Sequence, residues 1–114
     1  MSDAASMDVQ HVADFAAAGD FEKKHTPYIT LDKARDRTRV SVEVGHEVAH
    51  PNGPDHYITF IELYSGAVPL VRFDFSPQTA YPNVSVIVAL PVGTVIRAVE
   101  HCNLHGFWSY EVQV

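Results

Sequence analysis

The segment Arg39-Val40-Ser41-Val42-Glu43-Val44 is the clearest indication of fold class in this 114-residue chain. Valine occupies every second position, and the positions between carry polar or charged side chains. Because successive side chains of a strand point to opposite faces of a sheet, this alternation predicts a strand with one buried and one solvated face. The valines are therefore expected to cover a hydrophobic core.

Six more segments on either side of this stretch are expected to form strands. Residues 57–64 are typical, since they are rich in aromatic and β-branched side chains. Turn-forming groups such as Pro51-Asn52-Gly53-Pro54 separate the segments. About seven short strands at this spacing indicate an antiparallel sandwich or barrel, so the sequence predicts an all-β fold. The other expected strands are 28–31, 68–75, 84–90, 94–99 and 107–112.

The chain is expected to form one domain over residues 1–114, because no repeat, linker or low-complexity tract divides it. Residues 1–18 form an N-terminal extension that is rich in alanine and aspartate. Within this extension, residues 8–18 are expected to form a short helix with Val12 and Phe15 on one face.

The composition excludes some classes of function. The formal net charge is −6, and the basic residues lie in short groups without the basic stripe that nucleic-acid binding requires. No segment approaches the roughly 18 consecutive apolar residues of a membrane span. The first residues have neither the basic region nor the apolar run of a secretory signal. A single cysteine cannot form an internal disulfide, so a cytoplasmic location is expected.

Three separate stretches carry side chains that bind metals. Cys102-Asn103-Leu104-His105 places a thiol and an imidazole on one bend, and a turn-rich loop separates His50 from His56. Lys24-His25-Thr26-Pro27 adds a fourth imidazole. All five donors are expected in loops or at strand ends, where functional groups usually lie. Four imidazoles and a thiolate suit a mononuclear redox metal better than structural zinc, which prefers a closed tetrahedral site.

Taken in order, these stretches resemble the signature of the superoxide reductases of the neelaredoxin, or one-iron desulfoferrodoxin, family. The match includes Pro51-Asn52 after the second histidine and Gly106-Phe107-Trp108 after the fourth. The resemblance runs from about Gly19 to the C-terminus and implies an immunoglobulin-like β-sandwich. It also implies a mononuclear non-haem iron that alternates between Fe2+ and Fe3+. Its implied ligands are His25, His50, His56 and His105 in the equatorial plane and Cys102 on the axis.

The resemblance implies an enzyme that reduces superoxide to hydrogen peroxide with one electron from Fe(II) and two protons, without releasing oxygen. An axial thiolate would push electron density through the metal, as it does in thiolate-ligated haem. The backbone N–H of Asn103 is expected to donate to the Cys102 sulfur and thereby to tune the reduction potential of the metal centre. Family members are re-reduced by an electron-donor protein, usually rubredoxin, and are commonly homotetramers.

The resemblance also bears on Lys24 and Glu22, which precede His25 in the sequence. Lys24 matches a lysine that precedes the first ligand, and its ammonium is expected to attract superoxide and to orient a water that delivers a proton. In many members a glutamate two residues before this histidine closes the sixth iron position in the ferric state. Lys23 occupies that place here, and the nearest acid is Glu22. Glu22 is therefore one candidate for the ferric sixth ligand, and an open or water-bound ferric site is the alternative.

Two other classes of protein compete with this interpretation. A cupredoxin-like electron carrier also places Cys-x-x-His before its last strand, but it normally adds an axial methionine shortly afterwards. No methionine follows His105. A non-catalytic β domain that binds a partner would leave the three matching stretches unexplained.

Overall fold

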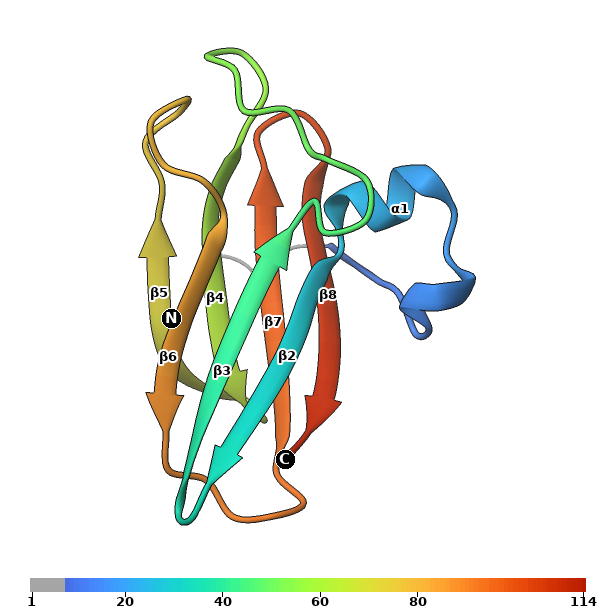
Figure 1. The fold of residues 1–114 in the computed structure, drawn as a ribbon. Coiled ribbons are helices and arrows are strands. Elements are labelled where there is room, and N and C mark those ends of the chain that lie inside the picture. The colour runs from blue at the N-terminus through green and yellow to red at the C-terminus, as the bar shows by residue number, and fades with distance from the viewer. Residues whose placement is uncertain (1–7) are drawn as a thin grey trace.

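The computed structural model describes residues 8–114, which form a sandwich of two sheets with one short α-helix beside it (Figure 1). The strands and helices, in chain order, are β1 (Val9–His11), a 3-10 helix (Phe15–Ala17), α1 (Asp20–His25), β2 (Pro27–Ala34), β3 (Arg37–Val44), β4 (Ile58–Ser65), β5 (Val68–Asp74), β6 (Asn83–Val88), β7 (Val95–Cys102) and β8 (Gly106–Gln113). The predicted all-β fold is confirmed, and the seven predicted strands correspond to β2 through β8.

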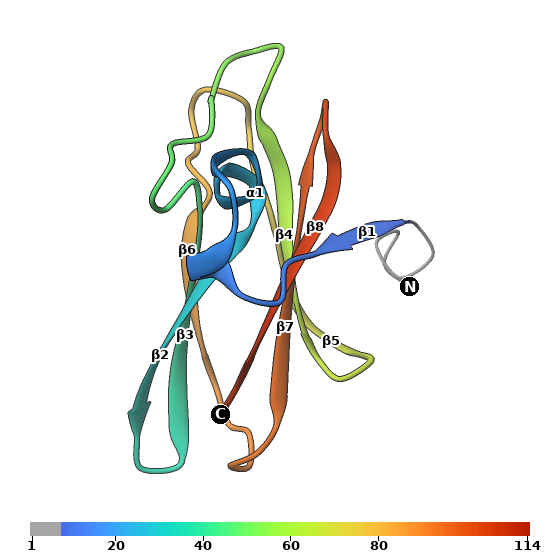
Figure 2. The same ribbon diagram turned by 90° about the vertical axis from the view of Figure 1, so that its right-hand side faces the viewer.

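The two sheets face each other across the core (Figure 2). One sheet has the strand order β1-β8-β7-β4-β5, and the other has the order β2-β3-β6. The short strand β1 pairs in parallel with β8, and all other neighbouring strands are antiparallel. The strands β2 and β3 therefore lie in one sheet, and β4 and β5 lie in the other, as in an immunoglobulin-like sandwich.

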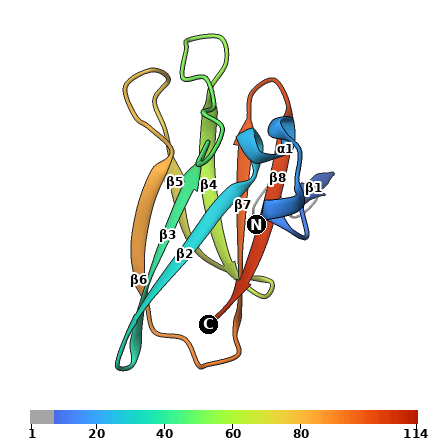
Figure 3. The same ribbon diagram turned by 45° about the vertical axis from the view of Figure 1, so that its right-hand side comes forward.

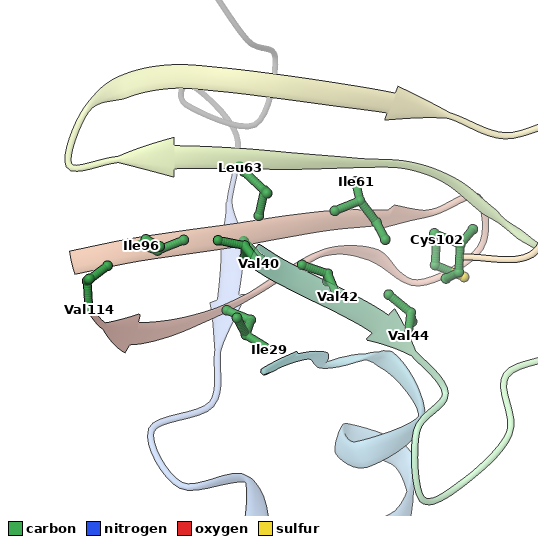
Figure 4. Close-up of a cluster of buried hydrophobic side chains, with 11 residues drawn as sticks. Ile29, Val40, Val42, Val44, Ile61, Leu63, Ile96, Cys102 and Val114 are labelled. Carbon is green, nitrogen blue, oxygen red and sulfur yellow. The ribbon is translucent and has the colours of Figure 1, made fainter. Parts of the chain in front are cut away.

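The core lies between the sheets and extends to the sulfur of Cys102 (Figure 4). The alternating valines of β3 point into it, as predicted, and Val40 and Val42 are 0% exposed. Ile61 and Leu63 of β4 pack against them from the opposite sheet. Burial of each such side chain contributes roughly 1.5–3 kcal/mol. Cys102 is the last residue of β7 and belongs to the same cluster, so core packing determines where its sulfur lies.

The predicted helix over residues 8–18 is wrong. Residues 9–11 form β1 on the edge of the larger sheet, because β8 offers unpaired backbone groups there. The Asp14 carboxylate then accepts from the Ala16 N–H and begins the 3-10 helix. Val12 and Phe15 are both buried, as expected, but they do not lie on one α-helix: Val12 follows β1 and Phe15 begins the 3-10 helix. Residues 1–7 of the predicted extension lie outside the described part of the chain.

The helix α1 was not expected, and it places His25 at a helix end instead of in a loop. Its acidic residues lie in the first turn and its basic residues in the last turn, which complements the helix dipole. The Glu22 carboxylate also accepts from the Gly19 N–H, at 3.0 Å. The helix lies near the turn between the end of β7 and the start of β8 (Figure 3). Within residues 8–114 no helix is long and apolar enough to cross a bilayer.

Candidate metal centre

Four of the predicted donors meet at one end of the sandwich. His25 comes from the end of α1, His50 and His56 come from the β3–β4 connection, and Cys102 comes from the end of β7. One ligand atom of each lies within 4.8 Å of the corresponding atoms of the others. The His50 Nε2 is 3.4 Å from the Cys102 Sγ. Figures 1 and 3 both show these three segments together at this end. Three distant stretches of sequence therefore converge.

His105, the fifth predicted donor, lies beside this group and outside the 4.8 Å set. Its ring centroid is 5.0 Å from that of His25 and 5.2 Å from that of His56. These spacings resemble the 4.7 Å between the His50 and His56 rings. His105 lies in the exposed turn between β7 and β8. The structure thus brings its ring next to the other imidazoles, and its role as a ligand stays a prediction.

Hydrogen bonds orient two of the rings towards a common centre. The His25 Nδ1–H donates to the Phe21 carbonyl at 2.8 Å, and the His50 Nδ1–H donates to the Pro51 carbonyl at 2.7 Å. A carbonyl can only accept, so each Nε2 keeps its lone pair for a metal. The Nε2 atoms of His25 and His56 are buried without a hydrogen-bond partner among residues 8–114.

Unpaired buried polar atoms are costly, and a metal ion at this point would satisfy them. Imidazole nitrogens together with a thiolate sulfur suit iron, so the residues present fit the metal that the sequence predicts. The donor set and the orphaned nitrogens are independent observations that agree.

Burial keeps the three clustered imidazoles neutral. It lowers the pKa of His50 to about 4, and it also lowers the pKa of His25 and of His56. The Lys24 ammonium is close enough to lower the pKa of all three rings further by repulsion. Because only a neutral imidazole can bind a metal, these rings are ready to do so at neutral pH.

The environment of Cys102 favours a neutral thiol in the metal-free protein. Burial raises the pKa of the Cys102 thiol, while the backbone N–H groups of Leu104 and His105 point at the sulfur and oppose this rise. The prediction that the Asn103 N–H donates to the sulfur is wrong. That N–H donates to the Tyr57 carbonyl at 3.2 Å, because the turn directs the next two amides towards the sulfur instead.

The three residues before His25 have different surroundings. Glu22 caps the helix through the Gly19 N–H and is outside the metal-binding group. The Lys23 Nζ forms an ion pair with the Glu47 carboxylate at 2.8 Å. Lys24 is half-buried, and within residues 8–114 it forms no ion pair.

A family model of desulfoferrodoxins matches residues 17–111. The chain belongs to the desulfoferrodoxin family. A superoxide reductase of Pyrococcus abyssi is 37% identical over 112 residues, which cover 89% of this chain and 96% of that protein. A superoxide reductase of Pyrococcus horikoshii is 35% identical over 107 residues, which cover 85% of this chain and 93% of that protein. The solved structure of a superoxide reductase (neelaredoxin) from Ignicoccus hospitalis matches with a TM-score of 0.76 at 31% identity and covers 93% of each chain.

Two aromatic residues enclose the His25 ring in this member of the desulfoferrodoxin family. Trp108 stacks on it at 5.1 Å between centroids and donates its Nε1–H to the His105 carbonyl at 3.1 Å. Trp108 therefore packs directly beside the clustered imidazoles. Phe21 lies 4.6 Å from the same ring and was missed. Its position four residues before His25 would have suggested the contact if the helix had been expected.

Glu100 is a second residue that the sequence interpretation missed. It is 0% exposed, and neither carboxylate oxygen has a hydrogen-bond partner within residues 8–114. Burial raises the pKa of its carboxyl group well above the ordinary value, and a charge there would raise the pKa of Cys102. The sequence does contain a sign of this. Glu100 alternates with Ile96, Ala98 and Cys102 along the strand, so it lies on the face where apolar side chains are expected.

These charge states predict a proton count for metal binding. At pH 7, one metal ion that binds the clustered donors should displace about one proton, which comes from Cys102, because the imidazoles of His25, His50 and His56 are already neutral. The apparent affinity should rise about tenfold per pH unit while the thiol remains protonated. Anaerobic calorimetric titration with Fe(II) in buffers of different ionisation enthalpy measures this number. The variant Cys102→Ser should bind more weakly and release no proton; release of two or more protons by the unaltered protein would contradict neutral imidazoles.

Proposed function

We propose that this protein is a superoxide reductase, which converts superoxide, one electron and two protons into hydrogen peroxide. The observation that carries the proposal is the convergence of His25, His50, His56 and Cys102 within 4.8 Å in a chain of the desulfoferrodoxin family. The superoxide reductases of two Pyrococcus species align over nearly their whole lengths, which supports the same activity here.

The four converging side chains would hold one iron ion, and His105 is the proposed fifth ligand. Bound iron would supply the electron from its ferrous state. The chain itself keeps the donors in place and in the right protonation state. The Nδ1–H bonds orient His25 and His50, and Trp108 packs over the His25 ring.

The buried sulfur leaves one side of the centre for the substrate. Cys102 is 0% exposed and faces the core, so a small anion cannot approach from that direction. His50 and His56 are only partly buried and mark the side that solvent reaches. Superoxide is therefore proposed to approach from the solvent side.

Reaction products distinguish this function from its rivals. Metal analysis should find one iron per chain, whereas a cupredoxin-like carrier would hold copper. Anaerobic mixing of the reduced protein with a pulse of superoxide should then yield hydrogen peroxide without oxygen. Release of oxygen together with peroxide would indicate a dismutase, and neither product would indicate an electron carrier or a binding protein. The zinc-loaded protein has the same charge and no redox activity, so it serves as the control.

Lys24 is proposed to attract superoxide and to orient the water that delivers a proton. Two observations support this role: the Lys24 side chain is half-buried, and its charge lowers the pKa of all three clustered imidazoles. In a protein of net charge −6, a local cation of this kind can guide a small anion.

Lys24→Ala should slow the superoxide-dependent oxidation of the ferrous protein about tenfold at low ionic strength, and salt should reduce the difference. Stopped-flow absorption after a superoxide pulse gives the rate. Lys33→Ala is the matched control, because it removes the same charge from an exposed strand position away from the centre. An unchanged rate in Lys24→Ala would reject the role.

Glu22 is proposed to act as a helix cap, with water or an open position completing the ferric centre. Its hydrogen bond to the Gly19 N–H supports this role. Glu22→Ala should leave the ferric absorption spectrum and its pH dependence unchanged while lowering stability by about 0.5–1 kcal/mol. Glu22→Gln keeps the cap and should match the unaltered protein in both measurements. A spectral change shared by both variants would show that the carboxylate reaches the iron.

The reaction requires an electron source after each turnover. Rubredoxin, the usual donor in the family, is the proposed partner, and a homotetramer is the proposed assembly by the same resemblance. The single cysteine is buried and free, which supports a reducing compartment such as the cytoplasm.

A further inference from the structure

We infer that Asn103 is a positioning residue that connects the backbone on both sides of His56 to the turn that carries Cys102. The Asn103 Oδ1 accepts from the Tyr57 N–H at 2.9 Å, and its Nδ2–H donates to the Asp55 carbonyl at 3.0 Å. The Asn103 backbone N–H also donates to the Tyr57 carbonyl at 3.2 Å. We call these three hydrogen bonds the Asn103 bridge. The inference rests on the proposed metal site.

His56 depends on its backbone more than the other imidazoles of the cluster do. The rings of His25 and His50 are each oriented by an Nδ1–H bond to a carbonyl. Over residues 8–114 the His56 ring has no such bond, and its buried Nε2 has no partner. The direction of this ring is therefore set by the position of the chain from Asp55 to Tyr57, which is the segment that the Asn103 bridge holds.

Regular sheet pairing ends just where the bridge begins. Ile58 is opposite Cys102, and the β4–β7 register shifts between Ile58 and Phe60. On the other side, the Gly53 N–H donates to the His56 carbonyl at 3.0 Å and closes a tight turn. The carboxamide of Asn103 satisfies the backbone groups that neither the ladder nor this turn pairs. It thus continues the connection between β4 and β7 past their last regular pair.

The bridge is expected to affect metal binding more than folding. The Asn103 side chain is exposed, so water competes for its hydrogen bonds and their contribution to stability is small. Metal affinity is more sensitive than folding stability to the position of a ligand. Loss of a residue that orients a metal ligand typically weakens metal binding about 10–100-fold. Loss of the Asn103 side chain removes two of the three hydrogen bonds, so the segment that carries the His56 imidazole gains freedom relative to the Cys102 sulfur, which the core holds.

The experiment compares Asn103→Ala, Asn103→Asp and the control Asn83→Ala by titration with Co(II) and by amide hydrogen exchange of the metal-free proteins. Asn83 is an exposed asparagine whose side chain forms no hydrogen bond within residues 8–114. Asn103→Ala should weaken Co(II) binding at least about tenfold and speed exchange of the Tyr57 amide. Asn83→Ala should change neither quantity.

Asn103→Asp separates the two halves of the carboxamide. It keeps the oxygen that accepts from Tyr57 and loses the donor to Asp55, so the Tyr57 amide should stay protected while affinity falls by an intermediate amount. The added negative charge would by itself favour a cation, so weaker binding reports the lost donor. If Asn103→Ala fails to fold by circular dichroism, this variant decides the question.

Unchanged Co(II) affinity in a folded Asn103 variant, with the unaltered protein binding normally, would overturn the inference. Equal losses in Asn103→Ala and Asn83→Ala would also overturn it. Failure of the unaltered protein to bind Co(II) or iron would instead count against the proposed function. The two failures are therefore distinguishable.

Discussion

The centre depends on one constraint, which is that a single sulfur atom belongs both to the hydrophobic core and to the metal-binding group. Cys102 ends β7 and packs in the cluster that contains the valines of β3. The close packing of that cluster leaves the sulfur one position. The imidazoles come from α1 and from the β3–β4 connection, and they must reach this position from outside the core. The sandwich is thus the rigid part of the centre.

Without a metal, this end of the molecule carries unfavourable electrostatics. The Nε2 atoms of His25 and His56 are buried without partners among residues 8–114, and burial opposes ionisation of Cys102. A metal ion would accept the lone pairs and stabilise the thiolate, while the Leu104 and His105 amides already point at the sulfur. Binding would therefore add to the stability of the folded state, since an unfolded chain offers no such arrangement.

The geometry of α1 explains why three consecutive residues, Glu22, Lys23 and Lys24, make different interactions. Successive residues of an α-helix are separated by about 100°, so Glu22, Lys23 and Lys24 point in three directions. The first caps the helix, the second pairs with Glu47, and the third raises the local positive potential at the imidazoles. A glutamate two residues before the first histidine is absent here, and Lys23 in its place connects α1 to the loop of His50 instead.

Local patterns in the sequence were enough to predict the fold class and the four side chains that cluster. Alternation such as that of Val40 and Val42 depends only on the two-residue period of a strand, and Cys102-x-x-His105 is local in the same way. Such patterns did not determine α1 or β1, because α1 has six residues and β1 has three, too few for a periodic pattern. The folded structure was needed to show that three distant stretches meet, that the Asn103 side chain bonds to the backbone on both sides of His56, and that Glu100 is buried. These facts depend on contacts between residues far apart in the chain, which no local pattern records.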